Sequence, residues 1–121
     1  MKLFDHEKLN VYQAAIRFVA WSSDLTNDLP KNPAVFRQLD RAATSIPLNI
    51  AEGNGKFTPP DRCRFLDIAR GSALECAACL DVMVAKKLID QSVVDAGKQS
   101  LIEIVSMLVG LIRANSDSRE F

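Results

Sequence analysis

Two cysteines separated by two residues are the first feature of this sequence that could do chemistry. Cys76 and Cys79 have the spacing of redox-active and metal-binding pairs. A redox pair of that kind lies at the start of a helix that follows a strand, where the helix dipole lowers the pKa of a thiol. Here the pair falls in the middle of a long helical pattern, and the sequence has no second pair with this spacing. We therefore interpret both residues as core cysteines.

The other candidates for catalysis lack the partners that they need. His6 is the only histidine, so the sequence supports neither a histidine metal cluster nor a serine–histidine–carboxylate triad. The Gly-Asn-Gly segment at residues 53–55 matches no phosphate-binding loop and is typical of a helix end. Glu52 and Glu75 lack the Glu-x-x-His motif of di-metal bundles. We expect no enzymatic activity, no metal and no cofactor.

Polar side chains gather along one helical face in the middle of the chain. Spacings of four, four and three residues place four of them on the same face: Arg41, Ser45, Asn49 and Glu52. The next helical segment contributes Arg70, Ser72 and Glu75. Charges beside a core need partners, because their desolvation is costly. We predict an interhelical polar network that fixes the register of the two helices, with a ligand pocket as the alternative.

Basic residues are concentrated in the same part of the chain. Residues 31–70 hold seven basic and four acidic side chains, a net charge of +3, whereas the whole chain is neutral with 15 of each sign. The candidates for a nucleic-acid contact are Arg37, Arg41, Lys56, Arg62 and Arg64. Against such a contact stand the zero net charge and the absence of interleaved basic and aromatic residues.

Helices must position these residues, because apolar side chains repeat at spacings of three and four and no strand pattern appears. Two stripes of this kind are Phe36, Leu39, Ala43, Ile46 and Ile50, and then Leu66, Ala69, Ala73, Cys76, Leu80 and Met83. We expect one domain, 1–121, with helices at about 7–25, 33–53, 59–85 and 92–115. Short connections favour antiparallel neighbours. The predicted fold is an all-α, up-down-up-down four-helix bundle.

Capping residues predict where these helices begin. Side chains that can accept the free amides of a first turn precede or open the four helices: Asp5, Asn32, Thr58 and Ser92. Pro33 is expected at the first position of the second helix, where a missing amide costs nothing. Pro47 lies inside the same helix and is expected to bend it, because the apolar stripe continues beyond it.

Several helices carry more apolar surface than a four-helix core can cover. Residues 14–21 contain one polar side chain, Arg17. Residues 73–85 contain two, Glu75 and Asp81. A helix that is apolar on two sides needs a second surface to cover it. We predict lateral self-association.

The remaining features bear on the compartment. The apolar runs are far shorter than the ~20 residues that span a bilayer. The N-terminal residues are charged and lack the long apolar run of a signal peptide. The three cysteines are an odd number in a helical setting, which is typical of a reducing environment without a disulfide framework. We expect a cytoplasmic protein with no membrane partner.

Three segments together resemble a bacterial protein family. Residues 45–53 (SIPLNIAEG), 64–76 (RFLDIARGSALEC) and 4–12 (FDHEKLNVY) are similar to the four-helix-bundle proteins encoded in intervening sequences of 23S rRNA genes. The resemblance spans nearly the whole chain. It implies a ring-shaped homopentamer without enzymatic activity. Some relatives resemble accessory proteins of diversity-generating retroelements, which partner a reverse transcriptase and nucleic acid.

Three functions stay open at this point. The first is a homo-oligomeric interaction or scaffold protein whose partner is itself. The second is an RNA- or DNA-binding accessory protein that uses the basic residues of the second and third helices, alone or with a nucleic-acid enzyme. The third is an enzyme or small-molecule binder around Glu52 and Glu75.

Overall fold

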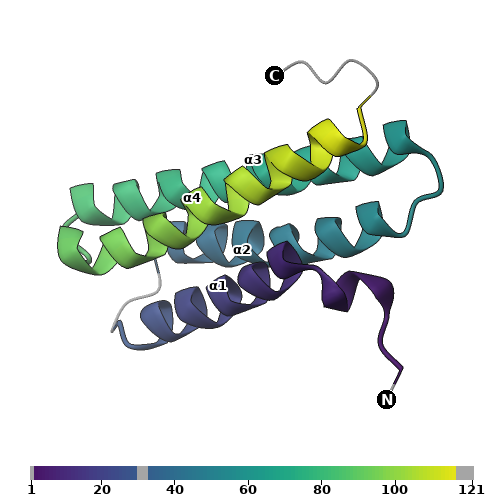
Figure 1. Ribbon diagram of the computed structural model, residues 1–121. Helices are drawn as coiled ribbons and strands as arrows, with labels where there is room; N and C mark the ends of the chain where they lie inside the picture. Colours follow the sequence, from purple (N-terminus) through teal and green to yellow (C-terminus); the bar gives the residue numbers. More distant parts are fainter. Residues whose placement is uncertain (1, 30–32, 117–121) are drawn as a thin grey trace.

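The computed structural model describes residues 2–29 and 33–116, and its elements are all helical. A short 3-10 turn precedes four α-helices: η1 Asp5–Lys8, α1 Asn10–Asn27, α2 Ala34–Asn54, α3 Pro59–Ala85 and α4 Gln91–Ala114 (Figure 1). Since no strand occurs among these described residues, the all-α prediction is confirmed.

The four helices form a closed circuit of neighbours. α1 packs on α2, α2 on α3, α3 on α4 and α4 on α1. The α2–α3 connection lies at one end of the helices, together with η1 and the end of α4 (Figure 1). The end of α1, the start of α2 and the α3–α4 connection lie at the opposite end (Figure 1). Residues far apart in the sequence are thereby brought together at each end.

The core is built from the apolar stripes that the spacing predicts. The stripe residues of α2 and α3 are all buried, and the largest side chains with no more than 2% exposure include Phe18, Leu39, Ile46, Leu80 and Leu108. Burial of this kind is the main source of stability in a helical bundle.

Cys76 and Cys79 belong to this core, as predicted. Burial raises the pKa of the Cys76 thiol from 9.0 to about 12, with smaller contributions from neighbouring Cys79 and Glu75. The pKa of Cys79 is raised for the same main reason, with Glu75 adding to it. Both thiols therefore stay protonated near neutral pH, and a protonated thiol is a poor nucleophile and metal ligand.

Two glycines allow helices to approach closely. A β-carbon on Gly97 of α4 would collide with the indole ring of Trp21 from α1. A β-carbon on Gly53 of α2 would lie 3.0 Å from Cβ of Phe65 and 3.2 Å from the carbonyl oxygen of Arg62. A side chain at position 97 would therefore displace the indole ring, and one at position 53 would press on α3.

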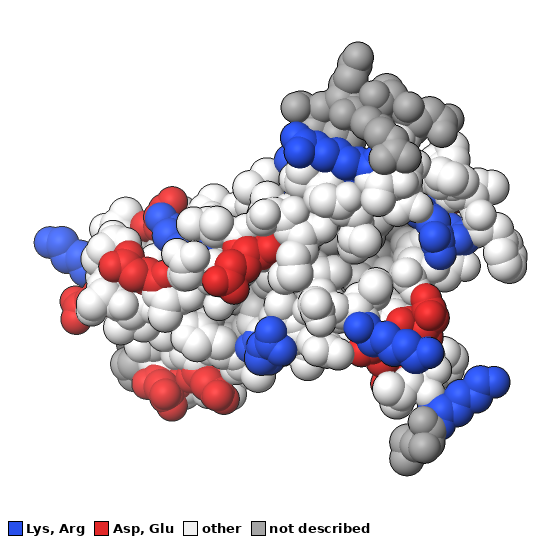
Figure 2. Space-filling model, viewed as in Figure 1, with Lys and Arg blue, Asp and Glu red and all other residues white. Residues whose placement is uncertain are grey.

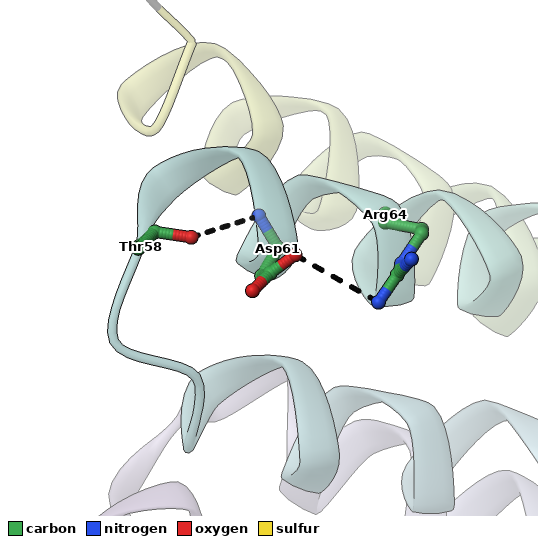
Figure 3. Close-up of polar contacts among 3 residues, drawn as sticks. All are labelled: Thr58, Asp61 and Arg64. Atoms are coloured by element: carbon green, nitrogen blue, oxygen red, sulfur yellow. Dashed lines mark hydrogen bonds and ion pairs between the residues drawn. The ribbon is translucent and has the colours of Figure 1, made fainter.

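The start of α3 is capped as predicted. Oγ1 of Thr58 accepts a hydrogen bond from the backbone amide of Asp61 at 3.4 Å (Figure 3). Pro59 and Pro60 occupy the first two helical positions, where no amide partner is lost. Within α2, the helix continues through Pro47 and ends at Asn54, with Gly55 as its C-cap residue.

The structure corrects the predicted start of the first helix. Asp5 lies in η1, and α1 begins at Asn10 after Leu9. The carboxylate of Asp5 instead accepts a hydrogen bond from Nδ2 of Asn54 at 2.9 Å. Asp5 therefore holds η1 against the end of α2, a long-range contact that local capping rules do not contain.

Two further capping predictions also change. α4 begins at Gln91 after Asp90, so Ser92 lies in the first turn and is not the cap. Pro33 precedes the first residue of α2 as its N-cap residue and does not occupy the first helical position. Asn32, the other predicted cap of this helix, lies outside the described residues.

Candidate functional site

The connection between α2 and α3 is held together by Arg62, from the first turns of α3. Its Nε donates a hydrogen bond to the carbonyl oxygen of Lys56 at 2.9 Å, and Nη2 donates to that of Asn54 at 2.8 Å. The last carbonyls of a helix lack internal partners and form the negative end of its dipole, so a guanidinium is stabilised there. Arg62 thus ties the start of α3 to the end of α2.

Cations and aromatic rings lie together on the outside of this connection. Nζ of Lys56 is 4.9 Å, and the guanidinium of Arg64 is 5.2 Å, from the centroid of the Phe65 ring. Arg64 also pairs with Asp61 at 3.7 Å, although this exposed pair contributes little stability (Figure 3). Phe57 projects into solvent with 101% exposure. We call this group the tip: Lys56, Phe57, Arg62, Arg64 and Phe65.

The two phenylalanines of the tip were missed by the sequence analysis, which found no interleaved basic and aromatic residues. The structure corrects that statement, because the chain reverses between the end of α2 at Asn54 and the start of α3 at Pro59, and this brings Lys56 over the ring of Phe65. The signal that could have found them is a pair of dipeptides, each a basic residue followed by phenylalanine, one within the helix break and one in the helix that follows it.

The other two predicted basic contacts lie elsewhere. Arg37 and Arg41 are exposed on the first half of α2. Arg41 precedes the end of α2 by 13 residues. That separation is about 20 Å at 1.5 Å per residue. The five predicted nucleic-acid contacts therefore fall into two separate groups, and Arg62 is engaged by backbone carbonyls.

The predicted polar network has a small interhelical centre. Oγ of Ser45 in α2 accepts hydrogen bonds from Oγ of Ser72 in α3 at 2.8 Å and from Nδ2 of Asn49 at 2.9 Å. The same amide of Asn49 also donates to the backbone carbonyl of Ser45 at 2.9 Å. These half-buried neutral groups satisfy one another and link the two helices.

The charged members of the predicted network lie outside this centre. Arg70 pairs with Asp67 of its own helix at 2.9 Å, and Glu75 accepts a hydrogen bond from Gln38 of α2 at 3.5 Å. Arg41 and Glu52 are exposed, and within the described part of the chain neither side chain has a hydrogen bond or ion pair. Solvent removes the need to pair such charges. Hydrogen bonds between side chains of α2 and α3 thus include Ser72 to Ser45 and Gln38 to Glu75, and neither involves a buried charge.

An apolar groove runs between α3 and α4. Its volume is about 380 Å³, and its lining includes Ala73, Leu74, Ala77, Leu101, Ile102 and Val105. Leu74 and Ile102 are 51% and 61% exposed. Lys98, which also lines the groove, forms an ion pair with Asp81. This groove is one place where the apolar excess expected from the sequence reaches the surface.

Charges are unevenly placed on the face drawn in Figure 2. Asp and Glu side chains lie mainly over the end of the bundle where α3 connects to α4 (Figure 2). Lys and Arg side chains lie over the middle and toward the end that carries the tip, and both ends of this face carry some side chains of each sign (Figure 2). On this face, acidic side chains are therefore more frequent at the α3–α4 end than at the end that carries the tip.

Comparison with known proteins identifies a family by sequence and a similar fold by structure. Residues 7–110 match the model of the family described as 23S rRNA-intervening sequence protein. The chain belongs to this family. No curated protein matches it. A similar solved structure is the crystal structure of a protein of unknown function, of the S23 ribosomal protein family, from Bacteroides thetaiotaomicron.

The likeness between that bacterial protein and this family member is one of fold. The two are 24% identical, with a TM-score of 0.79, over 84% of this chain and 97% of the other. Within residues 2–29 and 33–116, no helix is both long and apolar enough to cross a membrane. The same residues contain no group of three or more His, Cys, Asp or Glu side chains placed to hold a metal ion.

Proposed function

We propose that this 23S rRNA-intervening sequence family member is a non-enzymatic, cytoplasmic, homo-oligomeric interaction or scaffold protein. The observation that carries the proposal is the apolar groove between α3 and α4, where Leu74 and Ile102 are half or more exposed. Contiguous exposed apolar surface is a mark of protein interaction sites. A second copy of the chain is the partner that is always present at matching concentration.

The proposed assembly is a ring of antiparallel bundles. The antiparallel arrangement is supported by connections that lie at alternate ends of the helices (Figure 1). Five subunits are preferred, because the family resemblance implies a homopentamer. Closed rings are built from one repeated head-to-tail contact, and such a contact uses two different faces of each subunit.

Solution mass tests this proposal. Sedimentation velocity and light scattering on the full chain at micromolar concentration should give about five times the 13.4 kDa subunit mass. Dilution should not reduce this mass until the concentration falls below the dissociation constant. A monomer at every concentration would contradict the proposal.

A second candidate function is binding of single-stranded RNA or DNA at the tip. The observation that favours it is the fully exposed ring of Phe57 next to Lys56. Stacking of a base on an aromatic ring contributes about 1–3 kcal/mol, and lysine and arginine neutralise the phosphates beside it. An assembly would repeat the tip in every subunit, so a weak contact could gain affinity through avidity.

The second candidate is tested by titrating fluorescent single-stranded oligonucleotides at about 50 mM salt, where phosphate contacts are strong. We expect affinity to fall steeply with added salt and to fall about tenfold in Phe57→Ala. The matched control is Phe4→Ala, since Phe4 is also an exposed aromatic residue at 76% exposure. Absence of binding, or equal binding by the Phe57 variant, would remove the tip from consideration.

A further inference from the structure

The outer face of α2 carries an exposed leucine between two opposite charges. Leu48 is 63% exposed. Arg41 lies seven residues before it and Glu52 four residues after it, so the three share one helical face. Both charged side chains are exposed, and neither has a hydrogen bond or ion pair among residues 2–29 and 33–116. This face therefore presents an unpaired cation and an unpaired anion about 16 Å apart, at 1.5 Å per residue.

The α3 wall of the groove repeats this spacing with the charges exchanged. Leu74 stands at the mouth of the groove with 51% exposure. Asp81 lies seven residues after it and Arg70 four residues before it. Each of these charges already has a partner within the chain, yet the Asp81 side chain is 61% exposed and the Arg70 side chain 38%. A carboxylate and a guanidinium both have capacity for further hydrogen bonds.

We propose that the outer face of α2 in one subunit docks into the α3–α4 groove of a second copy of this chain. Leu48 enters the groove beside Leu74 and Ile102 of the other copy. Arg41 then faces Asp81 and Glu52 faces Arg70 of that copy. The inference rests on the proposed self-association and names the two faces that carry it.

The charges select one orientation of the two helices. In the antiparallel orientation each charge on α2 meets its opposite on α3. In the parallel orientation, with the two leucines aligned, Arg41 would lie level with Asp67 but Glu52 would lie level with Ala78, so only one of the two charges would gain a partner. Such arrangements give specificity and register, while the buried leucines supply most of the affinity.

The geometry of this contact suits an assembly of identical subunits. The face of α2 that carries Leu48, which we call the knob, and the groove between α3 and α4 are different faces of one subunit, so an open chain of such contacts always has a free knob at one end and a free groove at the other. Contacts of this head-to-tail type close into a ring or extend as a filament. The small floor residues Ala73 and Ala77 leave room for an entering side chain.

The test uses two full-length variants, Leu48→Asp and Leu74→Asp, in sedimentation velocity. Both positions are exposed, so each variant should keep the helical circular dichroism of the wild type. Each alone should be a monomer, because one of the two complementary faces is lost. Their equimolar mixture should form a 1:1 dimer, since Leu48→Asp retains an intact groove and Leu74→Asp retains an intact knob.

Charge exchange gives an independent measurement on the same contact. We expect Arg41→Glu and Asp81→Arg each to weaken self-association at least tenfold, and the double variant Arg41→Glu/Asp81→Arg to recover most of it. Val93→Asp at the start of α4 is the matched control, because Val93 is 41% exposed and lies outside both faces. It should keep the wild-type mass.

The possible outcomes separate this inference from the proposed function. A monomeric wild type would overturn both. A wild-type oligomer combined with an unaltered mass for Leu48→Asp or Leu74→Asp would overturn this contact alone, as would a mixture that stays monomeric. If the groove binds a different protein and not a second copy, the purified wild-type protein would also be a monomer, and the inference would be overturned.

Discussion

α3 has a neighbour on each side, and the two seams are built differently. Toward the tip, its seam with α2 is closed by the fit of Gly53 against Phe65, by the two hydrogen bonds of Arg62 and by the Ser45–Ser72 hydrogen bond. The seam with α4 is open along a groove of about 380 Å³ with alanines on its floor. A smaller groove of about 270 Å³ remains between α2 and α3 near the start of α2.

We infer from this difference that the α2–α3 seam stabilises the subunit and that the α3–α4 seam serves assembly. Polar contacts in the closed seam have defined geometry, so they fix how α2 and α3 lie against each other. Apolar contacts in the open seam are non-directional and leave surface uncovered, so a partner can use them. We expect substitutions in the closed seam to change subunit stability and substitutions in the open seam to change assembly.

The largest expected effect is that of Gly53→Val. Because a β-carbon would press on Phe65 and on the backbone of Arg62, the variant should lose about 3 kcal/mol of unfolding free energy. Chemical denaturation at fixed protein concentration measures it. Gly71→Val is the control: Gly71 lies in α3 with no atom within 4 Å of its added β-carbon, so it should be neutral or slightly stabilising. Equal losses would show that the seam is not closely packed.

Arg62→Ala should cost about 2 kcal/mol. The reason is that two charge-assisted hydrogen bonds are lost, one to Asn54 at the end of α2 and one to Lys56 in the connection. Arg64→Ala is the neighbouring control, with a side chain that is 66% exposed, and we expect a change within about 0.5 kcal/mol. Thermal melting of both variants under the same conditions gives the comparison. Indistinguishable melts would mean that Arg62 does not hold the connection.

Ser45→Ala and Ser72→Ala should each cost about 1 kcal/mol, because each leaves a half-buried hydroxyl without its partner across the helices. A double-mutant cycle isolates their interaction. We expect the double variant to lose less than the sum of the two single losses. If the two losses simply add, the two hydroxyls do not interact. The contact between α2 and α3 would then lack this polar link, as the contact between α3 and α4 does.

Ile102→Gln should have the smallest effect on the subunit. Ile102 is 61% exposed, so its replacement should change the unfolding free energy by no more than about 0.5 kcal/mol when measured on dissociated subunits. Its effect should appear in the solution mass, which should fall. A large loss of subunit stability with an unchanged solution mass would contradict the assignment of the α3–α4 groove to assembly.

The amino-acid sequence was sufficient for the helices and their buried faces. The stripe through Phe36, Leu39 and Ile46 is buried as its spacing predicts, and the Thr58 cap forms where the local pattern places it. These features depend on contacts within three or four residues, which the order of residues states directly. The interpretation of Cys76 and Cys79 as core residues rested on the same local pattern.

Other features were decided by tertiary structure. Asp5 contacts Asn54 and does not cap α1, Arg62 binds the end of α2 rather than solvent, and Lys56 lies over the ring of Phe65. The charged side chains of the predicted polar network are likewise divided between solvent and local partners.

The physical reason is range. Helical periodicity fixes which face of a helix is apolar. The partner of a charged or aromatic side chain on the polar face, however, can be a residue far away in the sequence that only helix packing brings close. The sequence by itself therefore determined the helices and the core of this protein. Only the packing of α3 between α2 and α4 decided that one seam closes and the other remains open as a groove.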